Sequence, residues 1–231
     1  MSLLDVQNLT AGYGNATVLD DLTFTVGMGE SLAVLGRNGV GKTTLMLAII
    51  GHARRFGGKL QWKGHDIATV RACDRAHMGI GWVPQERDIF PSLTVEENLL
   101  VARRAGPFDL AEIYRLFPRL QERRRNMGDK LSGGEQQMLA IGRALITNPE
   151  LILLDEPFEG LAPVIVEELE ATLSLLRSER RFSLIIVEQH AEDALRLSDR
   201  AIVLDRGRLV LQGSSAELLA NFDEVRSWIA V

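Results

Sequence analysis

A glycine-rich stretch at residues 36–44 has the composition of a phosphate-binding loop. It reads GRNGVGKTT and matches the pattern G-x-x-x-x-G-K-[ST], with the strand-like run SLAVL before it and the helical pattern LMLAII after it. The glycines allow backbone N–H groups to turn inward around an anion, and the next helix presents its positive end to the same place. The residues predicted to bind the phosphates of a nucleotide are Gly36, Arg37, Asn38, Gly39, Val40, Gly41, Lys42, Thr43 and Thr44.

Lys42 and Thr43 carry the side chains that phosphoryl transfer needs in such a loop. The Lys42 ammonium is predicted to contact the β- and γ-phosphates, and the Thr43 hydroxyl is predicted to bind Mg²⁺, which bridges the same phosphates. The alternative is a glycine-rich turn with a solvated lysine. The flanking strand and helix make that alternative the weaker interpretation.

A second motif, LILLDEP at residues 151–157, supplies two adjacent carboxylates at the end of an apolar strand. Asp155 is predicted to hold Mg²⁺ directly or through water, and Glu156 is predicted to polarise the attacking water as the catalytic base. The alternative is an acidic turn closed by Pro157. The phosphate loop elsewhere in the chain favours the catalytic interpretation.

A third motif, LSGGEQQ at residues 131–137, precedes an apolar pattern with helical spacing. Ser132 followed by two glycines indicates a helix N-terminus with exposed N–H groups, which would form a second anion-binding site in the chain. A serine and two glycines that only cap a helix are the alternative.

These motifs need a scaffold that brings the ends of their strands together. Four apolar runs of strand length are predicted to be strands buried on both faces: 31–36, 151–155, 183–187 and 201–205. Helices are predicted at 42–50, 94–105, 109–117, 134–147, 163–178 and 191–197. The alternation of strands and helices indicates a parallel α/β core. The short, β-rich segments near both ends, such as LLDVQNL and RLVLQG, favour an antiparallel flank.

The composition excludes several other classes of protein. The chain has 231 residues, 46% hydrophobic content and a net charge of −5, so it can bury one core and does not present a surface for nucleic acid. Its single cysteine and four separated histidines make a structural metal site improbable. Without a secretory leader or a membrane-spanning run, the sequence predicts a soluble, cytoplasmic protein.

The order of the three motifs resembles that of the ATP-binding-cassette (ABC) ATPases, and the resemblance extends over essentially the whole chain. It implies an α/β P-loop NTPase of the ABC type, with a parallel core sheet, an antiparallel β flank and a helical subdomain at about residues 86–147. It also implies one domain over residues 1–231, ATPase activity, and ATP and Mg²⁺ as cofactors.

The same resemblance implies that two such chains are needed for activity. In ABC ATPases two cassettes pair head to tail, and each ATP lies between the phosphate loop of one chain and the LSGGEQQ signature of the other. Ser132, Gly133, Gly134 and Glu135 would therefore act on the nucleotide of the partner chain.

Two further positions take expected roles from the resemblance. Tyr13 in AGYGN matches the aromatic residue that stacks on adenine, and its alternative is a plain strand-end aromatic. Gln85 in GWVPQ matches the glutamine that senses Mg²⁺ and the γ-phosphate, and its alternative is a turn residue after Pro84.

Several segments are similar to the shorter, LivF-type ATPase subunit of branched-chain amino acid importers: FPSLTVEENL, LFPRLQERR, LSGGEQQMLAIGRAL and GLAP. Such a subunit pairs with a longer sister ATPase, or with itself in isolation. It lies on the inner face of the cell membrane beneath two permeases that receive solute from a periplasmic binding protein. An importer of urea or another amide, and a soluble ABC ATPase of cofactor assembly, are the alternatives. The groove that receives a permease helix would include residues 85–91, with Ile89, Phe90 and Leu93 either contacting that helix or filling a core.

The stretch IIVEQH at residues 185–190 ends a predicted strand with three polar residues. ABC ATPases usually place a histidine here that reaches the γ-phosphate, and the register of the following helix puts that position on Gln189. Gln189 is therefore the predicted γ-phosphate contact, with His190 as the alternative. Glu188 has no assigned chemistry. The segment PFEGLAP after Glu156 lacks the aspartate that many family members carry there, and Glu159 is not assigned its role.

Overall fold

The computed structural model of the chain describes residues 2–179 and 181–229. Its strands are β1 (Ser2–Tyr13), β2 (Ala16–Gly27), β3 (Ser31–Leu35), β4 (Arg54–Trp62), β5 (His65–Asp66), β6 (Ile80–Val83), β7 (Leu151–Asp155), β8 (Ser183–Glu188), β9 (Arg200–Asp205) and β10 (Arg208–Ser214). Its α-helices are α1 (Lys42–Ile50), α2 (Ala72–His77), α3 (Val95–Leu100), α4 (Leu110–Leu116), α5 (Pro118–Glu122), α6 (Gly133–Leu145), α7 (Pro163–Ser178), α8 (Ala191–Arg196), α9 (Ser215–Ala220) and α10 (Phe222–Ile229), and a 3₁₀ turn η1 (Gly128–Lys130) precedes α6.

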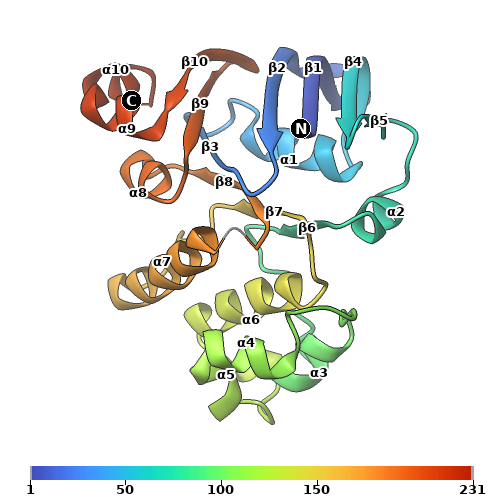
Figure 1. Cartoon of the computed structure of the whole chain (residues 1–231), viewed down its shortest axis with the longest axis vertical. Helices are drawn as coiled ribbons and strands as arrows, with labels where there is room; N and C mark the ends of the chain where they lie inside the picture. Colours follow the sequence, from blue (N-terminus) through green and yellow to red (C-terminus); the bar gives the residue numbers. More distant parts are fainter. Residues whose placement is uncertain (1, 180, 230–231) are drawn as a thin grey trace.

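Two sheets form the upper part of the molecule in Figure 1. The six-stranded sheet has the order β10-β9-β3-β8-β7-β6, in which all neighbouring pairs are parallel except β10 with β9. The four-stranded sheet, β2-β1-β4-β5, is antiparallel. A parallel core with an antiparallel flank is the arrangement that the sequence predicted.

The six-stranded sheet is buried on both faces, as strand β3 shows. Leu32 and Val34 on one face pack with α1 and the four-stranded sheet, whereas Ala33 and Leu35 on the other face join the core formed with α6, α7 and α8. All five residues of β3 are buried. This explains why its sequence is a continuous apolar run rather than an alternating one.

Helices α3, α4, α5 and α6 gather at the end of the molecule opposite the antiparallel sheet (Figure 1). The predicted helix 94–105 is wrong at its C-terminal end, because α3 stops at Leu100. The backbone N–H of Arg104 donates instead to the carbonyl of Ile146 at the end of α6, and the Arg104 side chain donates to the carbonyl of Ala76. These tertiary hydrogen bonds replace the last helical turn that local periodicity predicts.

Helix α2 is an element that the apolar pattern did not predict. Its buried arginine, Arg75, joins it to α1 by hydrogen bonds. Arg75 donates from Nη1 to the carbonyls of Ala48 and Ile49 at 2.8 Å each, and from Nη2 to the carbonyl of Ile67 at 2.6 Å. The guanidinium therefore satisfies the carbonyl groups at the C-terminal end of α1, where a cation is favoured.

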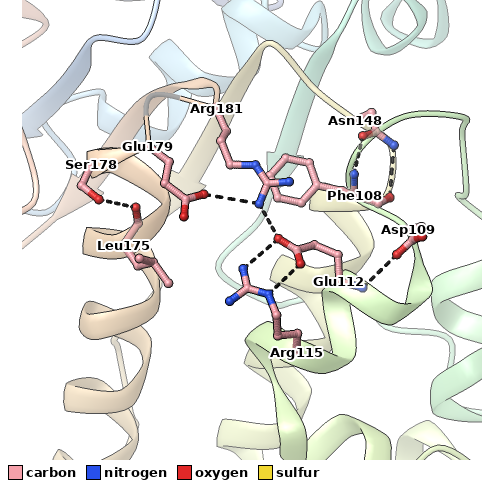
Figure 2. Close-up of polar contacts among 9 residues, drawn as sticks. All are labelled: Phe108, Asp109, Glu112, Arg115, Asn148, Leu175, Ser178, Glu179 and Arg181. Carbon is pink, nitrogen blue, oxygen red and sulfur yellow. Dashed lines mark hydrogen bonds and ion pairs between the residues drawn. The ribbon is translucent and has the colours of Figure 1, made fainter.

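An ion-pair cluster joins the helical end of the molecule to the loop before β8 (Figure 2). Glu112 of α4 accepts from Arg115 Nε at 2.7 Å and also accepts from Arg181 Nη1. The Arg181 guanidinium lies over the ring of Phe108, 4.1 Å from its centroid. Hydrogen bonds from Arg115, opposed by partial burial and aided by Arg181, lower the pKa of Glu112 to about 2. The cluster therefore stabilises the fold in the ionised form of Glu112.

Glu112→Gln is expected to lower the free energy of unfolding by roughly 1 to 2 kcal/mol at pH 7, because two arginines lose their carboxylate. Since the folded-state pKa of Glu112 lies below its unfolded value, this stabilisation is complete above about pH 4.5 and is lost as the pH falls towards 2. Urea unfolding at pH 7 and pH 4 measures the difference in unfolding free energy between the variant and the wild type. Glu122→Gln on exposed α5 is the control, and equal losses in both variants would contradict the assignment.

Candidate functional site

The carboxyl ends of β3, β7 and β8 meet at one edge of the six-stranded sheet. The phosphate loop follows β3, Asp155 and Glu156 lie at the end of β7, and Gln189 follows β8. Ligands of open α/β sheets bind at this edge. A cleft of about 280 Å³ opens there, and its lining residues are Val18, Asn38, Gly39, Gly41, Lys42, Thr43, Thr44, Gln85, Glu156, Glu159 and Gln189.

The phosphate loop needs glycine at positions where its backbone turns left-handed. Gly36 has a φ of 149° and Gly41, the residue before α1, has a φ of 112°. A Cβ atom on Gly36 would lie 2.5 Å from the carbonyl oxygen of Leu204, and one on Gly41 would lie 2.7 Å from the Leu19 side chain. The loop can therefore wrap closely around an anion only with these two glycines.

Lys42, the first residue of α1, is buried at the centre of this loop. Its Nζ atom donates to the carbonyl oxygens of Gly36 and Arg37 at 2.8 and 3.0 Å and lies 3.7 Å from Glu156 Oε1. Burial lowers the pKa of Lys42, and the nearby carboxylates of Glu156 and Asp155 oppose that effect. The loop thus holds a cationic group next to the N-terminus of α1, where phosphate binds.

Asp155 and Thr43 contact each other next to Lys42 and together offer two oxygen atoms as metal ligands. The Thr43 hydroxyl donates to Asp155 Oδ1 at 3.4 Å, and Asp155 is 1% exposed. Burial raises the pKa of Asp155 to about 6, with the Thr43 hydroxyl opposing this rise and Glu156 adding to it. A hydroxyl and a carboxylate are ligands that suit a hard divalent cation, which would favour the ionised form of Asp155.

Glu156 has an unusual backbone conformation for a residue with a side chain. Its φ is 48°, in the left-handed region, and its N–H donates to the carbonyl of Val187 at 2.9 Å. The Glu156 Oε2 atom accepts from Gln189 Nε2 at 2.8 Å. Strained conformations of this kind cluster at active sites. The turn therefore directs the carboxylate into the cleft beside Lys42.

In the described chain Gln189, and not His190, forms a hydrogen bond with the catalytic-base candidate. Gln189 lines the cleft with Glu156 and donates to its carboxylate, whereas His190, the residue before α8, does not line this cleft. Both residues are exposed. The γ-phosphate contact of Gln189 stays a prediction.

Gln189→Ala is expected to lower kcat for ATP hydrolysis by about tenfold to a hundredfold, because it removes the predicted donor to the γ-phosphate and the hydrogen bond to Glu156. His190→Ala is the matched control and should retain the wild-type rate within about twofold. Steady-state ATPase assays at saturating ATP compare them. A large loss in the histidine variant alone would reverse the assignment.

Gln85 and Tyr13 lie at the margins of the cleft. The Gln85 side-chain N–H₂ donates to Glu159 Oε2, which leaves its carbonyl oxygen available as an acceptor or ligand. Tyr13 is 46% exposed and its hydroxyl lies 3.4 Å from Thr44 Oγ1, so its ring is accessible to a base. Val18 and Glu159 also line the cleft, and the sequence assigned a role to neither. The separation of 74 residues between Glu159 and Gln85 left no signal in the spacing.

The signature residues lie away from this cleft, at the N-terminus of α6. The Ser132 hydroxyl accepts from the N–H of Glu135, whose carboxylate accepts from the N–H of Ser132 at 2.8 Å, so the two form a capping box. A Cβ atom on Gly134 would lie 2.8 Å from the Ile165 side chain of α7, so packing requires this glycine. In the described chain no signature residue lines the cleft, so the predicted role on a partner's nucleotide stays a prediction.

Comparison with known proteins identifies the family. The model of the ABC transporter family matches residues 19–159, which is more than half of the chain. The chain belongs to the ABC transporter family. This membership confirms the predicted ABC-type P-loop fold, and this ABC ATPase binds and hydrolyses ATP.

Three curated relatives cover nearly the whole ABC ATPase. It is 38% identical to the high-affinity branched-chain amino acid transport ATP-binding protein BraG of Pseudomonas aeruginosa, with 95% of this chain and 96% of the relative covered. It is 34% identical to the lipopolysaccharide export system ATP-binding protein LptB of Haemophilus influenzae, with 98% and 96% covered. It is also 34% identical to the probable branched-chain amino acid transport ATP-binding protein LivF of Archaeoglobus fulgidus, with 95% of each covered.

Solved structures give the same fold. A nucleotide-free ATP-binding cassette from an ABC transporter has a TM-score of 0.85 and 24% identity, with 100% of this chain and 98% of that chain covered. An ATP-binding subunit of an ABC transporter has a TM-score of 0.80 and 29% identity, with 100% and 95% covered. Among the described residues, no helix is long and apolar enough to cross a membrane.

Proposed function

We propose that this ABC ATPase energises an importer of branched-chain amino acids from the inner face of the cell membrane. The observation that carries the proposal is its 38% identity over nearly its full length to BraG, supported by the similarity to LivF of Archaeoglobus fulgidus. The similarity to LptB supports a second candidate, an ATPase that drives lipid export. The solute itself would contact the permease and the periplasmic binding protein rather than this chain.

In the proposed reaction, ATP lies with its phosphates in the loop of residues 36–44 and its adenine against Tyr13. Mg²⁺ fits the oxygen pair of Thr43 and Asp155, with the Gln85 carbonyl oxygen as a further ligand or second-sphere acceptor. The described residues hold no cluster of three or more His, Cys, Asp or Glu side chains suited to a metal. Phosphate oxygens and water would therefore complete the coordination. This metal supplies charge neutralisation for the phosphates when it is bound.

Hydrolysis in this proposal depends on Glu156 as the base and on Gln189 as the γ-phosphate donor. Glu156 is 9% exposed and lies within 3.7 Å of Lys42, so its carboxylate is held beside the phosphate site with little competing water. It can accept a proton from the attacking water as the γ-phosphoryl group is released. Lys42 would transfer its contacts from loop carbonyls to the phosphates.

The proposed active unit contains two ATPase chains. Residues 132–135 present the N-terminus of the 13-residue helix α6 on a surface separate from the cleft of the same chain. Such a helix end attracts phosphate groups. We propose that it closes over the ATP of a second ATPase subunit, either the longer sister subunit of such importers or a second copy of this chain.

The surface proposed for the permease is an apolar groove between the core and the helical end of the molecule. It has a volume of about 660 Å³ and is lined by residues of α1, α2, β6 and α6, with Trp82 and Arg143 among them. Within the described chain, Trp82 Nε1 and Arg143 Nη1 are buried without a hydrogen-bond partner. Residues 85–91, which the sequence predicted to lie in the permease groove, do not line this one. Phe90, under the guanidinium of the lining residue Arg143, is 45% exposed and suits a contact with a permease, whereas Ile89 packs against the core.

Co-purification and uptake test the proposed function. A tagged chain expressed in its native host should retain two permeases and a second ATPase when membranes are extracted in mild detergent. Cells without the chain should lose uptake of radiolabelled leucine, with urea failing to compete in wild-type cells. Urea competition, or retention of lipid-export permeases, would overturn the amino-acid assignment.

A further inference from the structure

Glu188, the last residue of β8, is a buried carboxyl group next to the site that the proposed mechanism does not use. It is 2% exposed. Its Oε1 atom accepts from the backbone N–H of Phe158 at 3.1 Å, and its Oε2 atom accepts from the backbone N–H of Gln189 at 3.2 Å. A carboxyl group at this depth is costly unless it is hydrogen-bonded, and here both of its oxygens have partners.

The two amides belong to the two segments that carry the proposed catalytic groups. Phe158 lies in the turn of residues 156–159, which begins with the left-handed residue Glu156 and is closed by a hydrogen bond from the Glu159 N–H to the Glu156 carbonyl. Gln189 is the residue that donates to the Glu156 carboxylate. The Glu188 side chain therefore connects the turn after β7 with the end of β8, next to the hydrogen bond between Gln189 and Glu156.

We infer that Glu188 is a positioning residue for ATP hydrolysis, because its buried carboxyl group holds the backbone of the 156–159 turn and of Gln189 in one fixed relation. The inference rests on the proposed roles of Glu156 and Gln189. The turn is strained at Glu156, and strain of this kind persists only where surrounding contacts hold it. Loss of the carboxyl group would let the base move relative to the γ-phosphate, and a displacement of about 1 Å can cost a hundredfold in rate.

The surroundings of Glu188 are mostly acidic. Glu156 lies in the turn after β7, Glu170 on α7, and Asp193 and His190 at the start of α8. All four line a second cleft, of about 510 Å³, which Glu188 also lines and which adjoins the first at Glu156, Glu159 and Gln189. Lys42 of α1 is a nearby cation: burial lowers the pKa of Lys42, and the charges of Glu156, Asp155 and Glu188 oppose that effect. Burial raises the pKa of Glu188 to about 7, opposed by its two backbone hydrogen bonds and aided by Glu156.

This environment gives the inference a pH signature. The ionised carboxylate accepts from both amides, whereas the protonated form has one hydroxyl oxygen that accepts poorly. The kcat of the wild-type chain should therefore rise as the pH increases through about 7. This step should be absent in Glu188→Gln, whose amide does not titrate.

The test compares Glu188→Ala, Glu188→Gln and Glu170→Gln with the wild type in the full chain. Glu188→Ala should lower kcat by about tenfold or more and leave the ATP dissociation constant within about twofold, because only Glu156 and Gln189 are misplaced. Glu188→Gln should recover at least about a third of the wild-type kcat, since its amide oxygen can still accept from Phe158. Glu170→Gln removes a carboxylate from the same cleft without touching either amide, so it should retain the wild-type kcat within about twofold.

Any one of the following results would overturn the inference: a near-normal kcat in Glu188→Ala, an equal loss in Glu170→Gln, or a pH step that persists in Glu188→Gln. Equal losses in Glu188→Ala and Glu188→Gln with lowered unfolding temperatures would also overturn it, in favour of a purely structural residue. Glu156→Gln is assayed in parallel. If Glu156→Gln keeps its turnover, the proposed base is wrong; if only Glu188→Ala keeps it, the positioning role alone is wrong.

Discussion

Glu156→Gln is expected to lower kcat for ATP hydrolysis by about a hundredfold to ten-thousandfold while ATP affinity stays within about threefold of the wild type. The amide cannot accept a proton from the attacking water, yet its oxygen can still accept from Gln189 as the carboxylate does. The shape of the cleft is therefore kept and only the basicity is lost. Binding without turnover should hold two chains together around ATP.

Three measurements on one preparation test this expectation. Calorimetry gives the ATP dissociation constant, a phosphate-release assay gives kcat, and light scattering gives the molar mass with and without ATP and Mg²⁺. The variant should show an ATP-dependent doubling of mass that the wild type shows only transiently. Glu192→Gln, an exposed carboxylate on α8, is the control for the lost charge. Turnover near the wild-type rate in Glu156→Gln would exclude Glu156 as the base.

The sequence could predict most of the residues that line the cleft because their signals are local. Each motif joins a buried strand to a loop with defined residue types, as Gly36 to Thr44 does after β3 and Asp155 does at the end of β7. Parallel strands place their carboxyl ends at one edge, so the segments that follow β3, β7 and β8 had to meet there. The spatial contact between Thr43 and Asp155 follows from this rule, although the two residues are 112 positions apart.

Other features depend on contacts that leave no local signal. Helical periodicity continues past Leu100, but the backbone N–H of Arg104 pairs with the carbonyl of Ile146, the residue that follows α6 and lies more than forty positions further along the chain. Glu159 meets Gln85 only because the turn after β7 folds towards the strand end of β6. In the same way, Glu188 is recognisable as more than a strand-end residue only when the N–H of Phe158 is seen to point at it. Sequence spacing predicts which groups react, whereas the turns that position those groups are visible only in the structure.

Lys42→Ala is expected to weaken ATP binding by roughly a hundredfold, because it removes the charged donor of two phosphate contacts, each worth about 1.5 to 3 kcal/mol before compensation. The loss differs in kind from that in Glu156→Gln, since it should raise the dissociation constant as well as abolish turnover. The Lys42 ammonium also donates hydrogen bonds to the carbonyl oxygens of Gly36 and Arg37, and Lys42→Ala removes both of these hydrogen bonds from the loop.

That second effect makes the stability of Lys42→Ala part of the test. A loop that only loses phosphate contacts should unfold at nearly the wild-type temperature without nucleotide and should lose the stabilisation that ATP gives the wild type. A variant whose loop collapses should unfold at a lower temperature both with and without nucleotide.

Lys59→Ala, at an exposed position of β4, controls for the loss of one positive charge, and it should keep both ATP affinity and ATP-dependent stabilisation. If Lys42→Ala binds ATP with wild-type affinity in calorimetry, Lys42 does not contact the phosphates and the loop of residues 36–44 does not bind nucleotide as proposed. Normal unfolding without nucleotide together with no shift on adding ATP would instead isolate the ammonium as the group that holds the nucleotide.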